Sequence, residues 1–371
     1  MDCLRLPGYL LLAICICPGS TAEGNDDLAS KHADISQLQR ATDGVTKLQG
    51  WYNSSSGLYQ TTGWWNSANG ITVLADYARV SKSRSYNLIF ANTLAVAQTG
   101  KDGSKGFLNK YYDDEGWWAL AWIDVYDLTG DGRYLSIAES IFSDMTTGWD
   151  DSCGGGIWWS KDRQYKAAIA NELFLSVGAH LANRVSAQRG LYLDWANKEW
   201  VWFAHSGMIN SQNLINDGLG GGDSKTPANS CVNNGLTTWT YNQGVVLGGL
   251  VELSKLNGDA LIPQTAQNIA SAAISSLVDG NGILHDTCEP SCGADGVQFK
   301  GIFMRNLGAL ERAYPQATYK AFIQRNADSI WDKARGPDGL FGQVWSGPFG
   351  SGNAGSQIAA LDCIVAAAGF E

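Results

Sequence analysis

Two adjacent aspartates are the strongest chemical signal in this sequence. Asp113-Asp114 is followed by Glu115 and by the aromatic pair Trp117-Trp118. Hydrolysis of a glycosidic bond uses two carboxyl groups, one as acid/base and one as nucleophile or second base. Adjacent residues at the start of a helix can place their carboxyl groups about 5–5.5 Å apart, the separation typical of enzymes that retain the anomeric configuration. Two carboxylates that close cannot both ionise freely, so the pKa of one rises and that group can serve as the acid.

The same residues also have a purely structural interpretation. Acidic side chains at the N-cap and in the first turn of a helix are ordinary caps, and residue types alone favour this interpretation for Asp113 and Asp114. A second adjacent pair, Asp150-Asp151, lies beside Cys153 and three glycines, which indicates residues that shape a loop. Spacing alone does not choose between the two pairs as catalytic groups.

Tryptophans recur in adjacent pairs near the predicted helix ends. The pairs are Trp64-Trp65, Trp117-Trp118 and Trp158-Trp159, and further aromatic residues lie in or beside the same loops, namely Trp149, Trp239, Tyr241 and Trp345. Sugar rings stack on indoles, whereas sugar hydroxyls need polar partners, so a cleft lined in this way fits a neutral oligosaccharide. For any single tryptophan, packing between helices is an equally good explanation. In each pair, one indole can face the core and its neighbour the cleft.

Apolar residues recur at intervals of three and four along most of the chain. This periodicity predicts twelve helices, near residues 31–51, 65–81, 83–98, 115–129, 133–147, 164–184, 191–206, 240–257, 263–279, 297–313, 315–334 and 354–368. Gly130 and Asp131 supply a stop and a cap between two of them. Six helical hairpins closing into a ring form an all-α (α/α)6 barrel, so we expect residues 23–371 to be one catalytic domain. An open helical array is the alternative.

The predicted connections are alternately short and long. The long ones are rich in glycine and aromatic residues and cover residues 57–65, 100–118, 148–159, 207–239, 280–299 and 336–349. Each joins an odd-numbered helix to the next even-numbered one, so an up-and-down ring should gather all six at one end. Functional residues concentrate on such loops when a rigid scaffold holds them. We therefore expect the site at that end.

The first 22 residues have the pattern of a secretory signal peptide. Arg5 precedes an apolar run at 10–17 and small residues that end at Ala22, and the run is too short to span a bilayer. We therefore expect a secreted protein that is extracellular or associated with a cell wall.

The cysteines suit that oxidising compartment. Cys288 and Cys292 are candidates for one disulfide, Cys153 and Cys231 are candidates for a second, and Cys363 is a candidate for a buried free thiol. Asn53 begins the glycosylation sequon Asn-Ser-Ser.

Composition excludes several classes of partner. The 371 residues include 15 Trp and 44 Gly, and Asp+Glu number 36 against Lys+Arg 26, for a net charge of −10. This acidic balance argues against binding to nucleic acid and against a polybasic attachment to lipid. The four histidines are scattered and no Cys/His spacing suits zinc. We expect a monomer without a metal or cofactor.

Three stretches of the chain resemble glycoside hydrolase family 76, which comprises α-1,6-mannanases and related fungal wall proteins. They are YYDDEGWWALAWID at 111–124, GGGIWW at 154–159 and YKAAIANEL at 165–173. The resemblance extends to residues 238–244 and 296–303, and therefore to most of the chain after the signal peptide. Its most specific part is the string DDEGWW.

The resemblance implies an (α/α)6 barrel and endo-hydrolysis of α-1,6-linked mannan with retention of configuration. It assigns Asp113 as nucleophile and Asp114 as acid/base, which reverses the preference for simple capping. Candidate substrate-binding residues are Trp64, Trp65, Trp117, Trp118, Asn171, Glu172, Tyr241, Asn242 and Gln243. Two alternatives stay open: a transglycosidase acting on mannose-containing cell-wall or anchor glycans, and a non-catalytic glycan-binding protein.

Overall fold

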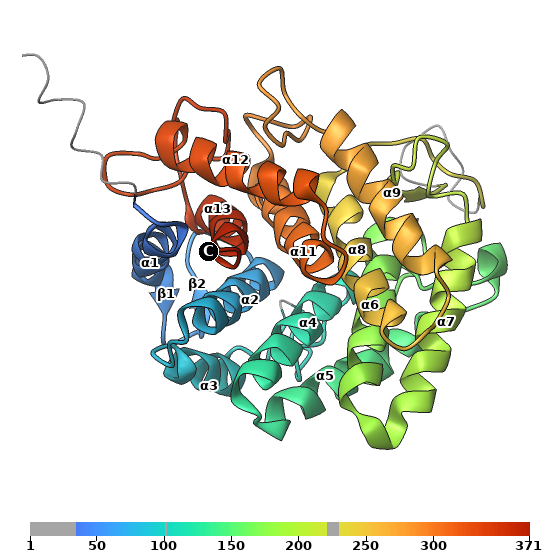
Figure 1. The fold of residues 1–371 in the computed structure, drawn as a ribbon. Helices are drawn as coiled ribbons and strands as arrows, with labels where there is room; N and C mark the ends of the chain where they lie inside the picture. The colour runs from blue at the N-terminus through green and yellow to red at the C-terminus, as the bar shows by residue number, and fades with distance from the viewer. Residues whose placement is uncertain (1–34, 101, 221–229) are drawn as a thin grey trace, which may run out of the picture. The chain divides into compact units, whose positions relative to one another are not determined.

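The computed structural model describes residues 35–100, 102–220 and 230–371. The expected signal peptide and residues 31–34 of the first predicted helix lie outside this part of the chain. Residues Ser36–Glu371 form one compact unit by their internal contacts. This unit is mostly helical (Figure 1).

Twelve of the helices in the described chain contain ten or more residues. They are α1 (Gln37–Leu48), α2 (Trp64–Ser81), α3 (Asn87–Val96), α4 (Tyr112–Thr129), α5 (Gly132–Thr146), α6 (Ala168–Arg184), α7 (Arg189–His205), α8 (Thr240–Ser254), α9 (Leu261–Ser276), α11 (Phe299–Ala313), α12 (Ala317–Lys333) and α13 (Ala354–Ala368), and α10 (Gly293–Gly296) is a single turn. Short strands form two antiparallel pairs: β1 (Tyr52–Asn53) with β2 (Leu58–Tyr59), and β3 (Lys166–Ala167) with β4 (Gly218–Leu219). The predicted helices are confirmed, with ends that differ by a few residues.

Six helices form a closed inner ring. Along this ring α2 contacts α4, α4 contacts α6, and the series continues through α8, α11 and α13 back to α2 (Figure 1). Glycines allow two of these helix pairs to approach closely. A Cβ on Gly244 of α8 would lie 2.6 Å from the Cα of Phe303, and one on Gly301 of α11 would lie 2.5 Å from the Cα of Ala359. Closure of the ring makes this an (α/α)6 barrel.

The outer helices bury one face each, as their apolar spacing predicts. In α5 the buried positions Tyr134, Ala138, Ile141 and Met145 recur at intervals of three and four and face α4. Each of α7, α9 and α12 likewise contacts the inner helix that precedes it in the chain. Within the described residues, no helix is both long and apolar enough to cross a membrane.

Local signals explain where the functional helix begins and ends. α4 stops at Gly130, whose φ of 72° suits glycine, and the Asp131 side chain then accepts from the backbone N–H of Arg133 to cap α5. One expectation needs correction, because α4 begins at Tyr112. Asp113 and Asp114 therefore lie within its first turn and do not precede it.

Both candidate disulfides are formed. Cys153 is bonded to Cys231 and Cys288 to Cys292, and Cys363 is a buried free thiol. The first bond joins the loop after α5 to the loop that leads into α8. Both of these loops contribute to the cleft described next.

Candidate active site

The first turns of the inner helices and the loops around them form a cleft of about 680 Å³. Its walls are Trp65, Asp102, Asn109, Lys110, Tyr111, Asp113, Asp114, Trp117, Trp159, Tyr165, Ala167, Ile169, Asp217, Tyr241, Asp295 and Phe299. Five of the six long connections contribute residues, so the expectation that they gather at one end is confirmed for these five. Residues of the sixth, including Gln343 and Val344, line a separate pocket of about 440 Å³.

The two adjacent aspartates lie side by side in the first turn of α4, and each accepts a hydrogen bond from a neutral donor. The indole Nε1 of Trp159 donates to Oδ2 of Asp113 over 2.9 Å, and the amide Nδ2 of Asn109 donates to Oδ2 of Asp114 over 2.6 Å. The second carboxyl oxygen of Asp113 is buried and has no hydrogen-bond partner among the described residues. One oxygen of Asp113 thus keeps an unused acceptor position.

Burial and charge both make Asp113 harder to ionise. Loss of solvent is the largest cause that raises the pKa of Asp113 well above its ordinary value, and the charge of Asp114 raises it further. The hydrogen bond from Trp159 lowers the pKa by less than these effects raise it. Asp113 consequently binds a proton more readily than an ordinary aspartate, as acid/base chemistry by a close pair requires of one member.

Glu115 does not line the cleft and has a different function. Its side chain is fully buried, and its Oε1 accepts from the backbone N–H of Asn109 over 2.9 Å and from Nζ of Lys161 over 2.8 Å. Burial raises the pKa of Glu115 to about 8, although Lys161 acts in the opposite direction. Glu115 thus holds Asn109 in place, and Asn109 in turn contacts Asp114.

Aromatic rings form one continuous wall of the cleft. Trp65 stacks on Trp117 with ring centres 5.6 Å apart, Trp117 on Tyr241 at 6.4 Å, and Tyr241 on Phe299 at 3.8 Å. The indole N–H of Trp65 donates to Oδ1 of Asp295 over 2.9 Å. The wall offers flat apolar faces with an acidic group at its edge, as a bound sugar chain requires.

Asp217, another acidic residue of the cleft, is bonded to a tyrosine. The hydroxyl of Tyr165 donates to Oδ2 of Asp217 over 2.6 Å and accepts from Nδ2 of Asn234. Burial raises the pKa of Asp217. Asp217, Asn109 and Tyr165 were missed as individual candidates. No local pattern marks Asp217, whereas Tyr165 lies within one of the family-like stretches.

Three of the nine predicted substrate-binding residues, Trp65, Trp117 and Tyr241, line the cleft. Their neighbours Trp64 and Trp118 do not line the cleft, and this part of the prediction is corrected. The indole of Trp64 donates to the carbonyl of Ala97, and Trp118 packs on Phe107 and Trp122. Successive side chains of a helix point about 100° apart, so only one member of each pair can face the cleft.

The remaining four predicted binding residues, Asn171, Glu172, Asn242 and Gln243, are also fully buried and do not line the cleft. The side chain of Asn171 bonds both backbone groups of Ile157, and that of Gln243 bonds both backbone groups of Ile215. These two amides fasten cleft loops to inner helices. The side-chain polar atoms of Glu172 and Asn242 have no hydrogen-bond partner within the part of the chain that the structure describes.

The cleft is strongly acidic. Five of its lining residues are aspartates, and the one lysine among them, Lys110, is paired with Asp162 at 2.5 Å. No three histidine, cysteine, aspartate or glutamate side chains of the described chain are grouped as a metal site would need.

Comparison with known families decides what kind of protein carries this cleft. The profile described as Glycosyl hydrolase family 76 matches residues 37–370. The chain belongs to glycosyl hydrolase family 76. Asp113-Asp114 and the aromatic wall lie within the part of the chain that matches this family. The resemblance identified from the sequence is confirmed.

Relatives within family 76 include a yeast protein and two solved structures. Mannan endo-1,6-alpha-mannosidase DCW1 of Saccharomyces cerevisiae is 28% identical over 279 residues, which is 68% of this chain and 59% of that protein. The chain thus spans about three-fifths of the length of such curated relatives. The GH76A alpha-1,6-mannanase from Salegentibacter sp. HEL1_6 superposes with a TM-score of 0.81 at 23% identity, covering 91% of this chain and 100% of that one. Dfg5 from Chaetomium thermophilum, in complex with glucosamine, gives 0.78 at 19% identity with 90% of each chain covered.

Proposed function

We propose that this protein is a retaining glycosidase that cleaves internal α-1,6-mannosidic linkages of mannan. The observation that carries the proposal is the pair Asp113-Asp114 in the first turn of α4, beside a wall of stacked rings. The names of the curated family relatives support it. Support also comes from an inactive variant of the Salegentibacter mannanase, in which two adjacent aspartates are replaced by asparagine, in complex with α-1,6-mannotriose.

The proposed reaction takes two steps at the anomeric carbon. Asp113 attacks this carbon while Asp114 protonates the leaving glycosidic oxygen, which gives a covalent glycosyl–enzyme intermediate. Asp114 then removes a proton from water, and the resulting attack releases a sugar with the original α configuration. The N–H of Trp159 bonds Oδ2 of Asp113, and Oδ1 has no partner among the described residues.

The direction of the Asp113 pKa and the family-based assignment disagree about which aspartate is the nucleophile. A nucleophile must be ionised, yet burial raises the pKa of Asp113 and favours its protonated form in the empty cleft. Bound sugar changes the surroundings of both carboxyl groups, and the proton can then reside on Asp114. We retain Asp113 as nucleophile because the aspartate order of the family-like motif assigns it.

Azide rescue tests this assignment directly. The Asp113→Ala and Asp114→Ala variants are incubated with an aryl α-1,6-mannobioside and sodium azide, and the product is analysed by NMR. Azide replaces a missing nucleophile from the opposite face, so Asp113→Ala should form the β-azide and Asp114→Ala the α-azide. The reverse pattern would make Asp114 the nucleophile. No azide product in either variant, with a wild type that does not cleave mannan, would contradict the proposed reaction.

The acidity of the cleft favours a second candidate, transfer of the glycosyl group to another glycan. Five aspartates suit a sugar that carries a protonated amine, and Dfg5 from Chaetomium thermophilum is known in complex with glucosamine. A transferase with the same aspartate pair would use an acceptor sugar in place of water. Incubation with mannan and an added acceptor separates the two functions, since only a transferase makes longer chains preferentially.

We also propose that the protein acts outside the cell, in the medium or at the cell wall. Its disulfides, Cys153–Cys231 and Cys288–Cys292, suit an oxidising compartment. Mass spectrometry of the natural protein tests this placement through its N-terminus, its glycan at Asn53 and its disulfides. A retained N-terminal segment with unmodified Asn53 would contradict it.

A further inference from the structure

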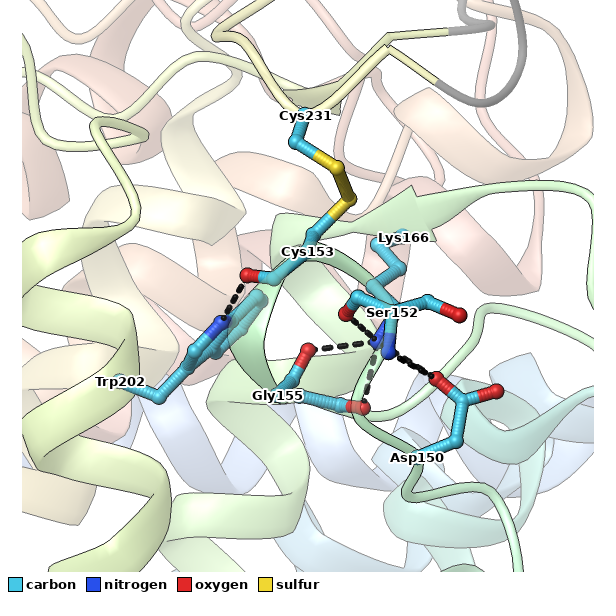
Figure 2. Close-up of a disulfide and its surroundings, with 8 residues drawn as sticks. Asp150, Ser152, Cys153, Gly155, Lys166, Trp202 and Cys231 are labelled. Atoms are coloured by element: carbon cyan, nitrogen blue, oxygen red, sulfur yellow. Dashed lines mark hydrogen bonds and ion pairs between the residues drawn. A yellow bond between two sulfur atoms is a disulfide. The ribbon is translucent and has the colours of Figure 1, made fainter.

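A buried lysine lies directly behind the cleft wall. Lys166 belongs to β3, and its side chain is only 2% exposed. Side chains alternate along a strand, and the residues on either side of it, Tyr165 and Ala167, both line the cleft. The Lys166 side chain points the other way, into the loop at 150–156 (Figure 2).

The loop surrounds the ammonium group with acceptors. Nζ of Lys166 donates to the carbonyls of Ser152 at 2.7 Å, Gly155 at 2.5 Å and Gly156 at 2.9 Å, and it lies 3.2 Å from Oδ1 of Asp150. Four consecutive residues, Cys153, Gly154, Gly155 and Gly156, have positive φ angles. This unusual backbone turns the carbonyls toward one point. Without a cation there, these carbonyls would be left without their donor.

The loop held by Lys166 connects to Asp113 in two short steps. Oδ2 of Asp150 accepts from the indole N–H of Trp158 over 2.7 Å. The next residue, Trp159, has its backbone bonded to Tyr165 on one side and to Tyr112 on the other. Its indole then donates to Oδ2 of Asp113. Together with Asn171, which bonds Ile157, this buried cation therefore helps to fix the loop that presents a hydrogen-bond donor to the proposed nucleophile.

We propose that Lys166 is a positioning residue that holds the indole of Trp159 against Asp113 by fastening the 150–159 loop. The assignment of Asp113 as nucleophile rests on the proposed function, but the positioning itself does not. Lys166 does not line the cleft, so its effect on the reaction passes through Trp159.

The expected signature is a change in the ionisation of Asp113. The bond from Trp159 lowers the pKa of Asp113, so a loosened loop should raise this pKa further. Asp114 on α4 also raises the pKa of Asp113, and Asp113 in turn acts on Tyr241 of α8; neither residue is altered in the variants below. Glu172 on α6 and Asp217 and Tyr165 of the cleft act on the same tyrosine and are likewise unaltered.

The test measures the titration of Asp113 in the ligand-free protein. Carboxyl-labelled aspartate is followed by ¹³C NMR, and the Asp113→Asn spectrum identifies the signal. We expect Lys166→Met and Trp159→Phe each to raise the midpoint by roughly half a pH unit or more, with the double variant no higher than the larger single effect. On mannan, kcat should fall roughly tenfold in Lys166→Met, with KM within about twofold.

Lys198→Met is the matched control. Lys198 is an exposed lysine that lies over the rings of Trp149 and Trp195, at 4.2 Å and 4.6 Å, on the outer helix nearby. It should leave the Asp113 midpoint unchanged. Lys166→Arg, which keeps the charge, should give a smaller shift than Lys166→Met.

Two results would overturn the proposal. One is an unchanged Asp113 midpoint in folded Lys166→Met, and the other is a double variant whose shift equals the sum of the two single shifts. If Lys166→Met does not fold, Asp150→Asn weakens the same connection and should shift the midpoint in the same direction; an unchanged midpoint there also counts against the proposal. Because the titration needs no substrate, absence of mannan cleavage by the wild type would contradict the proposed function and leave this test intact.

Discussion

Asp113 and Asp217, at the cleft end of the inner helices, have different partners from Glu252 at the other end. At the cleft end, Asp113 accepts from an indole and Asp217 from a phenol, both neutral donors. At the other end the last turns of the same helices line a pocket of about 370 Å³, where acids are paired with cations. There Arg184 contacts Asp127 at 2.6 Å and Glu252 at 2.9 Å, and Lys255 contacts Glu252 at 2.5 Å.

The difference in partners shifts the pKa values of these carboxyl groups in opposite directions. Although burial acts to raise it, the pKa of Glu252 is lowered to about 2 by the charges of His180, Arg184 and Lys255. The neutral donor of Asp113 offsets the effect of burial less than a cation does, so the pKa of Asp113 is raised. A carboxyl group that stays ionised at every working pH stabilises the fold but cannot exchange a proton. Of Asp113 and Glu252, Asp113 is therefore the group whose raised pKa suits it to hold and release a proton.

Removal of either carboxylate of the cleft pair should have the largest effect on activity. We expect Asp113→Asn and Asp114→Asn each to lower turnover of α-1,6-mannan by at least about 10³-fold, because each has a role that no neighbour replaces. Release of reducing ends gives the activity, and circular dichroism reports the fold. Full activity in both variants would contradict the catalytic assignment.

At the opposite end, the corresponding change should cost stability and leave the chemistry alone. Arg184→Met removes the cation that is bonded to both Asp127 and Glu252, and we expect a loss of about 3 kcal/mol in the free energy of unfolding, measured in denaturant. The kcat of the folded fraction should not change. Arg133→Met, which breaks an exposed pair with Asp131, is the control and should have a much smaller effect. Equal losses of unfolding free energy in the two variants would show that the buried ion pair stabilises the fold no more than the exposed one.

Glu252 and Asp113 should make contributions of opposite sign to the pH dependence of stability. The pKa of Glu252 is about 2 in the folded protein against an ordinary 4.5, so its stabilisation is complete above 4.5 and disappears as the pH falls toward 2. Wild type should therefore lose up to about 3 kcal/mol relative to Glu252→Gln over this range. Asp113 has a raised pKa, so Asp113→Asn should be more stable than wild type at neutral pH and lose this advantage in acid. If the stability difference from wild type changed with pH in the same direction for Glu252→Gln and Asp113→Asn, the comparison would be contradicted.

Within the cleft, an adjacent tryptophan pair gives the smallest predicted effect. Trp65→Ala removes an exposed stacking face, and we expect KM for mannan oligosaccharides to rise about tenfold with little change in kcat. Trp64→Ala removes a buried ring and should lower the melting temperature while KM stays within about twofold. A rise in KM for Trp64→Ala in place of Trp65→Ala would reverse the orientation assigned to the pair.

The fold was more predictable than the site, for physical reasons. Helix periodicity and caps are local, and the stop at Gly130 followed by the cap at Asp131 was readable from neighbouring residues. Asp113 and Asp114 were also found together because they are adjacent. By contrast, which tryptophan of a pair faces the cleft depends on where its helix starts. Asp217 joins the cleft only through folding, since it lies far along the chain from Asp113.

The account proposes above all that the cleft cleaves α-1,6-mannan with retention of configuration through Asp113 and Asp114. The most direct test incubates purified protein with unbranched α-1,6-mannan and follows product size and anomeric configuration by NMR. The account predicts short oligosaccharides released first in the α configuration by the wild type and absent with Asp113→Asn. Products released first as the β anomer, or bound mannan that is never cleaved, would contradict it.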